Sequence, residues 1–397
     1  MKQMNINASI VDTRKVQEDT LAQFDAILIN CAILITSPAA RAMMARHNVH
    51  INCSKSIDLD DETTLNTLNG KTTFTGRNTP NGRQYLLING TLTITPDAGD
   101  ALRQYMGMSI NGTVYCPDFL GTVLASKADL NGKLYTYPEG AVLLKNNAVL
   151  DKAFALRAES RLYWAAKRLI AVDEELDGEE LAAKGARFMV PEAYVSESLA
   201  DSLAPLFDAD TRMVVLPDGT SVVQDDLTLN AAGLRRYGDS LLVLGDLYLT
   251  ADCAEALGDL EYLQVEGDIY LPEDMADALD AVTETVLDGE VFYLPGKPIF
   301  GKLKMTVDKN LLDAFPDGLT LVACPKVYLA DDLTPADVLE HLSLFDCGLI
   351  FCKPELQSAA EAVASGSFQV LPKEDDEEEA ESSDPDNLII NAASYTL

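Results

Sequence analysis

The chain has 397 residues, and its 63 acidic residues outnumber its 30 basic ones, so its formal net charge is −33. A field of this sign repels nucleic acids and anionic membrane surfaces, so binding to either is not expected. It favours a protein partner, in particular a basic one. The hydrophobic content of 47% is enough to build a core, and no apolar run is long enough for a transmembrane helix, so membrane insertion is not expected.

Residues 1–25 are expected to form an N-terminal cap helix. Ser9 and Asp12 have the spacing of a capping box. The apolar residues that would line one side of this helix are Val11, Val16, Leu21 and Phe24. The first residues lack the charged-then-apolar order of a secretory signal and the seven cysteines are an odd number, so we expect a cytoplasmic protein. Removal of a leader would instead imply a secreted or cell-surface protein.

From residue 26 to residue 372 a short unit recurs, consisting of an apolar strand, a tight turn and a short helix. The clearest copies are centred on six glycines: Gly90, Gly112, Gly132, Gly245, Gly267 and Gly289. Cysteine stands in the same place at four positions: Cys31, Cys53, Cys324 and Cys347. The spacing is 22 residues from 90 to 112, from 245 to 267 and from 267 to 289. A fixed period of this length predicts a solenoid, in which each unit buries its apolar face against its neighbours.

One unit shows how the coil is built. Alternate residues from Leu86 to Ile94 are apolar, which predicts a strand with one buried face, and Thr95-Pro96-Asp97 then marks the start of a helix. The predicted fold is therefore an α/β repeat solenoid of short parallel strands and short helices, with about 20–23 residues per coil. The two glycine trios should each stack on adjacent parallel strands, with buried side chains two positions beyond the glycine: Leu92, Val114, Ile269 and Val291.

Units such as Leu241–Leu249 and Tyr262–Leu271 resemble leucine-rich repeats in their architecture. The resemblance covers most of residues 26–372, and it implies protein binding on a concave sheet. The regular asparagine of that family is not kept, because the asparagine of this chain, where present, precedes the glycine.

We expect one continuous solenoid over residues 26–372, with a divergent centre at 141–236. Residues 373–386 hold nine acidic residues and are expected to be a disordered linker. Residues 387–397 are apolar again. They are expected to add a strand to a sheet edge, on the same chain or on a second copy, which would make a homo-oligomer.

The sequence contains no phosphate-binding loop, dinucleotide fingerprint or nucleophile motif, so we expect no enzyme activity, cofactor or catalytic residue. His47, His50 and Cys53 are close in sequence but would not point the same way, so no metal site is expected. The repeated cysteines are best explained as small apolar filler, although neighbouring coils could bring two of them together.

The most unusual local composition is a basic and aromatic stretch in this acidic chain. Its candidate partner-binding residues are Arg157, Arg161, Tyr163, Trp164 and Arg168. The alternative is a core helix whose tryptophan fills the divergent centre. The resulting hypothesis is a non-catalytic repeat protein that acts as a protein-binding or scaffold module. The alternatives are an adhesin-like solenoid at the cell surface or outside the cell, and a self-associating structural protein.

Overall fold

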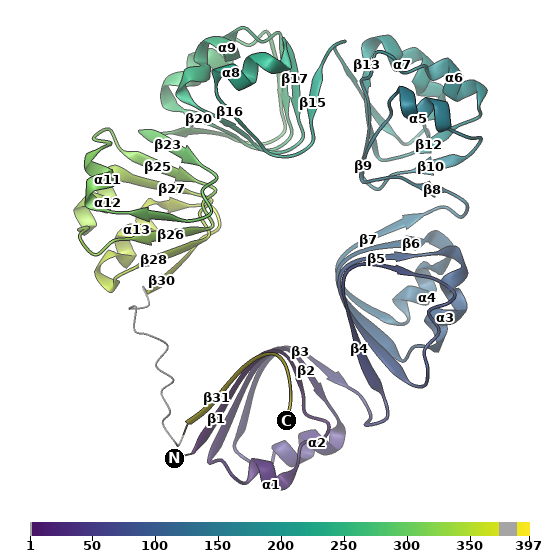
Figure 1. Cartoon of the computed structure of the whole chain (residues 1–397), viewed down its shortest axis with the longest axis vertical. Helices are drawn as coiled ribbons and strands as arrows, with labels where there is room; N and C mark the ends of the chain where they lie inside the picture. The colour runs from purple at the N-terminus through teal and green to yellow at the C-terminus, as the bar shows by residue number, and fades with distance from the viewer. Residues whose placement is uncertain (1, 373–386) are drawn as a thin grey trace. The chain divides into compact units, whose positions relative to one another are not determined.

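The computed structural model describes residues 2–372 and 387–397, and these residues form an α/β fold of repeated short parallel strands and short helices (Figure 1). Every strand pairing in the described ranges is parallel, as the coil pattern predicts. The chain divides into two compact units. The first contains the residues up to Ala141 together with the C-terminal strand, and the second begins at Val142.

The first unit contains two four-stranded sheets. The first sheet has the order β3-β2-β1-β31. Its strands are β1 (Gln3–Asp12), β2 (Ala26–Thr36), β3 (Val49–Asp58) and β31 (Asn387–Thr396). Its helices are α1 (Glu18–Leu21) and α2 (Pro38–Met44).

The second sheet of this unit has the order β4-β5-β6-β7. Its strands are β4 (Thr64–Phe74), β5 (Gln84–Ile94), β6 (Gly107–Pro117) and β7 (Ala128–Tyr137). Its helices are η1 (Pro96–Ala98), α3 (Gly99–Gln104), η2 (Asp118–Leu120) and α4 (Gly121–Ala125). The two sheets pack through an apolar cluster formed mainly by Ile33, Ile35, Ile57, Leu59 and Leu87.

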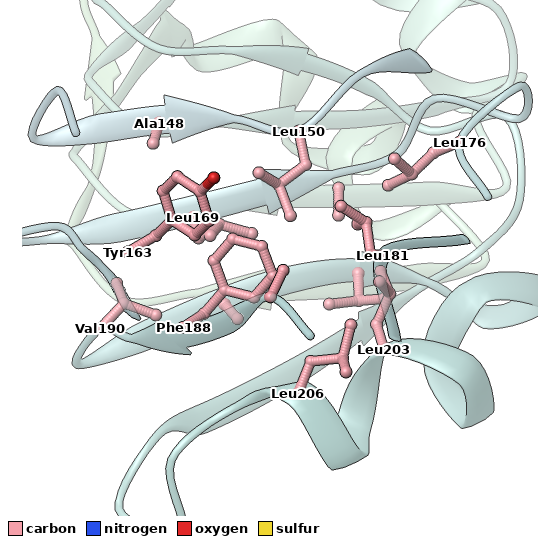
Figure 2. Packing of buried hydrophobic residues seen from close by; sticks show 14 of the residues in the cluster. Ala148, Leu150, Tyr163, Leu169, Leu176, Leu181, Phe188, Val190, Leu203 and Leu206 are labelled. Carbon is pink, nitrogen blue, oxygen red and sulfur yellow. The ribbon is translucent and has the colours of Figure 1, made fainter. Parts of the chain in front are cut away.

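In the second unit each coil contributes two short strands, which belong to two different sheets. The first pair of sheets has the orders β12-β10-β8 and β14-β13-β11-β9. The strands are β8 (Val142–Leu143), β9 (Asn147–Val149), β10 (Leu162–Trp164), β11 (Arg168–Ala171), β12 (Arg187–Met189), β13 (Glu192–Ser196) and β14 (Arg212–Leu216). The helices are α5 (Lys152–Arg157), α6 (Gly178–Ala183), α7 (Glu197–Leu203) and η3 (Ala204–Leu206). The divergent centre therefore keeps the βα coil, and its apolar core is shown in Figure 2.

The second pair of sheets has the orders β15-β17-β19-β21 and β16-β18-β20-β22. The strands are β15 (Ser221–Val223), β16 (Leu227–Leu229), β17 (Ser240–Val243), β18 (Leu247–Leu249), β19 (Tyr262–Val265), β20 (Ile269–Pro272), β21 (Glu284–Leu287) and β22 (Val291–Leu294). The helices are α8 (Ala231–Leu234), η4 (Arg235–Tyr237), η5 (Ala251–Cys253), α9 (Ala254–Gly258), η6 (Glu273–Met275) and α10 (Ala276–Asp280).

The third pair has the orders β23-β25-β27-β29 and β24-β26-β28-β30. The strands are β23 (Lys297–Phe300), β24 (Met305–Val307), β25 (Leu319–Val322), β26 (Lys326–Leu329), β27 (Leu342–Phe345), β28 (Leu349–Cys352), β29 (Ala364–Ser365) and β30 (Gln369–Pro372). The helices are α11 (Lys309–Asp313), α12 (Pro335–His341), η7 (Pro354–Leu356) and α13 (Gln357–Val363).

The first glycine trio lies on adjacent parallel strands, as predicted. Gly90, Gly112 and Gly132 are in register on β5, β6 and β7, with φ angles of 129°, 139° and 147°. A Cβ atom at Gly112 would collide with the carbonyl oxygen of Gly90. Glycine is therefore required both for its left-handed backbone and for the close approach of neighbouring strands.

The second trio also stacks, but in the bends between paired strands and not within a strand. The amide of Gly267 donates to the carbonyl of Gly245 at 3.2 Å, which places the two glycines one above the other. Ile269, two residues beyond Gly267, is buried as predicted. Val291, its counterpart beyond Gly289, is only half-buried, because β22 is the end strand of its sheet.

The predicted N-terminal cap helix is wrong. Residues Gln3–Asp12 form strand β1, which pairs with β2, and among the described residues 2–25 the only helix is the four-residue α1. The reason is visible in the repeat, because Ile6-Asn7-Ala8 lies in register with Ile29-Asn30-Cys31. Burial of alternate side chains, as in a strand, outweighs the helical spacing of the same apolar residues. Asp12 pairs with Arg14 rather than forming a capping box.

The C-terminal segment adds a strand to a sheet edge, as predicted, and does so on its own chain. Strand β31 pairs with β1 in parallel over residues 387–396 (Figure 1). The predicted disorder of 373–386 concerns residues outside the described ranges.

Candidate functional site

The basic and aromatic residues predicted as a partner surface do not lie on one surface. Tyr163 is buried in the apolar core of the second unit, where it lies near Phe188 (Figure 2). Its ring lies 5.2 Å from that of Phe154 and 5.6 Å from that of Phe188. Trp164, the next residue on β10, is also buried. This favours the core alternative, although the segment is a strand and not the helix that this alternative expected.

The arginines of this stretch have partners within their own unit. Arg157 donates from Nε to the carbonyl of Ala153 at 2.9 Å, and Arg161 pairs with Glu159 at 3.0 Å. Both arginines are exposed. Their role in partner binding stays a prediction.

Arg168 belongs to a largely buried ionic cluster. Its guanidinium forms ion pairs with Glu192, at 3.3 Å, and with Glu266. The carboxylate of Glu266 also accepts a hydrogen bond from the hydroxyl of Tyr194. Arg212 pairs with the other oxygen of Glu192 at 2.9 Å. Burial raises the pKa of Glu266 to about 7, and the carboxylates of Glu192 and Asp288 add to this rise while Arg168 opposes it. The cluster joins coils far apart in sequence and gives Arg168 two carboxylate partners.

A polar cleft of about 580 Å³ lies between the two sheets of the first unit. The first sheet lines it with Ser9, Ile10, Ala32, Ile33, Ser54 and Lys55. The second sheet lines it with Asn89, Ser109, Asn111, Asp129 and Asn131. We call this the ladder cleft, because three of its residues belong to a continuous asparagine ladder.

The ladder is formed by the asparagine that precedes each repeat glycine in the second sheet. The amide nitrogens of Asn89, Asn111 and Asn131 each donate to the amide oxygen of the preceding rung, at 3.0, 3.1 and 3.3 Å. Asn69 is the first rung. An amide has two N–H donors and two lone pairs, so each rung inside the ladder keeps one donor and one acceptor site for another molecule. The side chains of Asn69, Asn89 and Asn131 are exposed, and that of Asn111 is half-buried.

The same arrangement recurs in the first sheet. The amide nitrogen of Asn30 donates to Asn7 at 2.9 Å, and that of Asn7 donates to Asn391 on β31 at 3.0 Å. The position of the asparagine before the glycine or cysteine was visible in the sequence. Its meaning, a ladder of side-chain hydrogen bonds across strands, follows only from the register of the sheet.

Lys55 connects the two sheets at the floor of the ladder cleft. Its Nζ donates to Oγ of Ser109 at 2.8 Å and forms an ion pair with Asp129. Ser109 is only 3% exposed, whereas the side chains of Lys55 and Asp129 are 29% and 68% exposed. A serine acts as a nucleophile when a neighbouring base accepts its proton. Here the neighbour of the Ser109 hydroxyl is Lys55 Nζ, which donates its hydrogen bond to the serine oxygen and does not accept from it.

The repeated cysteines act as core filler. Cys324 and Cys347 are buried in the apolar core of the last pair of sheets. Cys31 and Cys53 are in-register neighbours on β2 and β3 that pack against the core of the first sheet, and all seven cysteines are free thiols. Burial, with a smaller contribution from Cys53, raises the pKa of Cys31 to about 11, which disfavours the reactive thiolate.

Within the described ranges, no three His, Cys, Asp or Glu side chains are arranged to hold a metal ion. Of the helices in these ranges, none has both the length and the apolar character needed to cross a membrane. Comparison of the chain with family models, with curated proteins and with solved structures gives no match.

Proposed function

We propose that this chain is a non-catalytic repeat protein that binds a protein partner through the ladder cleft of its first unit. The observation that carries the proposal is the combination in one cleft of an amide ladder with spare hydrogen-bonding groups and the Lys55–Ser109–Asp129 bridge. The resemblance of the coils to leucine-rich repeats, a class that binds proteins on a sheet, supports the same mode of action.

The charge of the chain favours a basic partner. A net charge of −33 accelerates the encounter with a cationic surface and disfavours acidic competitors. Asp129, whose side chain is 68% exposed at the edge of the ladder cleft, offers a carboxylate for a Lys or Arg of that partner. The seven free thiols support a location in the cytoplasm, where cysteines stay reduced.

The test compares two identical substitutions in one ladder. Asn111→Leu removes a rung inside the ladder cleft, and Asn69→Leu removes the end rung, which does not line it. The measured quantity is the amount of each partner protein that the chain captures from native lysate. We expect this amount to fall at least tenfold with Asn111→Leu and to stay at the wild-type level with Asn69→Leu. Equal capture by all three chains, or equal loss with both variants, would show that the cleft is not the binding site.

A second experiment separates binding from catalysis. If Ser109 were a nucleophile, a fluorophosphonate probe would label the wild-type chain and not Ser109→Ala. We expect no labelling at Ser109, because its buried hydroxyl accepts from Lys55 and has no base beside it. Labelling that depends on Ser109 would contradict the proposal.

A further inference from the structure

Strand β31 is a repeat unit that comes from the far end of the chain. Ile390-Asn391-Ala392 lies in register with Ile6-Asn7-Ala8 of β1 and repeats its order of apolar, amide and small residues. The fourth strand of the first sheet is thus supplied by residues separated from β1 by the whole second unit.

The contacts of β31 with β1 are those of a coil with its neighbour. A parallel ladder joins the two strands, Asn7 donates to Asn391 at 3.0 Å, and the amide of Leu397 donates to the carbonyl of Asp12 at 3.0 Å. Ile390, Tyr395 and Leu397 pack against the core of the first sheet. All of these groups belong to the strand and its acceptor. An identical strand from another molecule would make the same contacts.

We propose that the edge of β1 is an acceptor site for residues 387–397 of a second copy of this chain, so that two chains exchange their C-terminal strands. Exchange of an identical element keeps every contact of the closed form, so it is a low-cost route to a dimer. Here the exchanged element is short, lies at an edge and uses one repeat of the ladder motif.

Residues 373–386 separate β30 from β31 along the chain. The fourteen residues from 373 to 386 can reach up to about 50 Å when fully extended, at roughly 3.6 Å per residue. The net charge of −33 includes their nine acidic residues, so the approach of two chains is opposed by electrostatic repulsion, which salt screens. A short connection of this kind gives its own strand an effective concentration in the millimolar range. Exchange should therefore increase with protein concentration and with ionic strength.

The experiment uses the full chain in two isotopic forms. A photoreactive benzoylphenylalanine replaces Ser394, which is exposed and pairs with Ile10 of β1. Light-nitrogen and heavy-nitrogen preparations are mixed in equal amounts, warmed to allow exchange, and irradiated. Mass spectrometry of the cross-links between 394 and β1 then separates own-chain from second-chain docking, because only the latter joins light to heavy peptides.

We expect mixed-isotope cross-links to increase severalfold from about 10 μM to about 1 mM protein, and to increase again with added salt. Complete exchange would make half of these cross-links mixed, by random pairing. Ile390→Asp, which places a charge against the core, should abolish them, and Ile389→Asp, at a half-exposed position, should retain them.

Two results would overturn the proposal. One is that cross-links to β1 join peptides of one isotope at every concentration, which would mean that the strand docks on its own chain alone. The other is that mixed cross-links are as frequent when the photoreactive residue replaces Leu339, an exposed residue of α12, since these would report collision and not exchange.

Discussion

The two units build the same coil with different polar residues beside the glycine, and this difference changes the strand. In the first unit Asn111 precedes Gly112, and β6 runs unbroken from Gly107 to Pro117. In the second unit Asp268 follows Gly267, and the coil is broken into β19 and β20. The first arrangement gives one long, bent sheet per group of coils, and the second gives two short ones.

The hydrogen-bonding capacity of the side chain explains the difference. An asparagine both donates and accepts, so equivalent asparagines can bond to each other while the main chain stays in the ladder. An ionised aspartate can only accept. The carboxylates of Asp226, Asp246 and Asp268 therefore each accept a main-chain N–H from the next coil, at 3.0, 2.9 and 2.8 Å. Those amides leave the strand ladder, and the chain turns a corner there.

The largest expected effect distinguishes the two kinds of glycine. Gly112→Val combines a left-handed backbone with a collision against Gly90, and should lower the unfolding free energy by about 4 kcal/mol. Gly267→Val has no left-handed backbone and meets Asp246 and Gly245, so about 2 kcal/mol is expected. Urea melts of both variants measure this difference.

The control is Gly121→Ala, where a Cβ atom would meet no neighbour within 4 Å. It should be neutral or stabilise by up to about 1 kcal/mol. If the two valine variants lost equal stability, the left-handed backbone of Gly112 would not make it less tolerant of substitution than Gly267.

The second prediction concerns the strand that completes the first unit. Deleting residues 373–397 opens the edge of β1 and uncovers the core that Ile390, Tyr395 and Leu397 cover. We expect a loss of about 3 kcal/mol in the first unit and association through the open edge, seen in chemical melts and in sedimentation. Unchanged melting and sedimentation would show that β31 contributes nothing to the first unit.

The third prediction tests the position before the glycine in the second unit, where Glu266 replaces the asparagine. Its pKa in the folded state, about 7, lies above the unfolded value of about 4.3, so the folded state binds the extra proton and loses stability as pH rises between these values. Glu266→Gln lacks this titration. The stability of the variant relative to wild type should therefore increase by roughly 2–3 kcal/mol between about pH 4.3 and 7.

A difference between Glu266→Gln and wild type that stays flat over this pH range would mean that burial does not raise the pKa of the Glu266 carboxyl group.

The smallest effect tests the ladder chemistry itself. Asn111→Asp removes the donor to Asn89 and should cost about 1 kcal/mol, with a smaller cost once low pH protonates the new carboxylate. Asp268→Asn keeps an acceptor for the amide of Glu290 and should cost less. Thermal melts of the two variants at neutral and low pH make the comparison. An equal loss of stability in the two variants would mean that donor capacity does not distinguish the asparagine ladder from the aspartate–amide hydrogen bonds of the second unit.

Much of the fold was determined by the sequence alone, because the repeat is local. The period, the alternation within each strand and the helix starts specify one βα coil, and a coil with an apolar face must stack on its neighbours. This was enough to predict the parallel sheets, the register of Gly90, Gly112 and Gly132, and the strand formed by the C-terminal segment. Where a degenerate repeat also had helical spacing, at the N-terminus, local pattern alone gave the wrong element.

The candidate site was decided by the tertiary structure. The asparagines were visible as a pattern, but the cleft needs Lys55 and Ser109, which lie 54 residues apart and meet because apolar residues of the two sheets pack together. The burial of Tyr163, one of the predicted partner-binding residues, also followed from tertiary packing, since its ring lies in the core of the second unit. Spacing along the chain determines which side chains share a face. Only the packing of one sheet against another determines which faces meet, and therefore where a binding site can form.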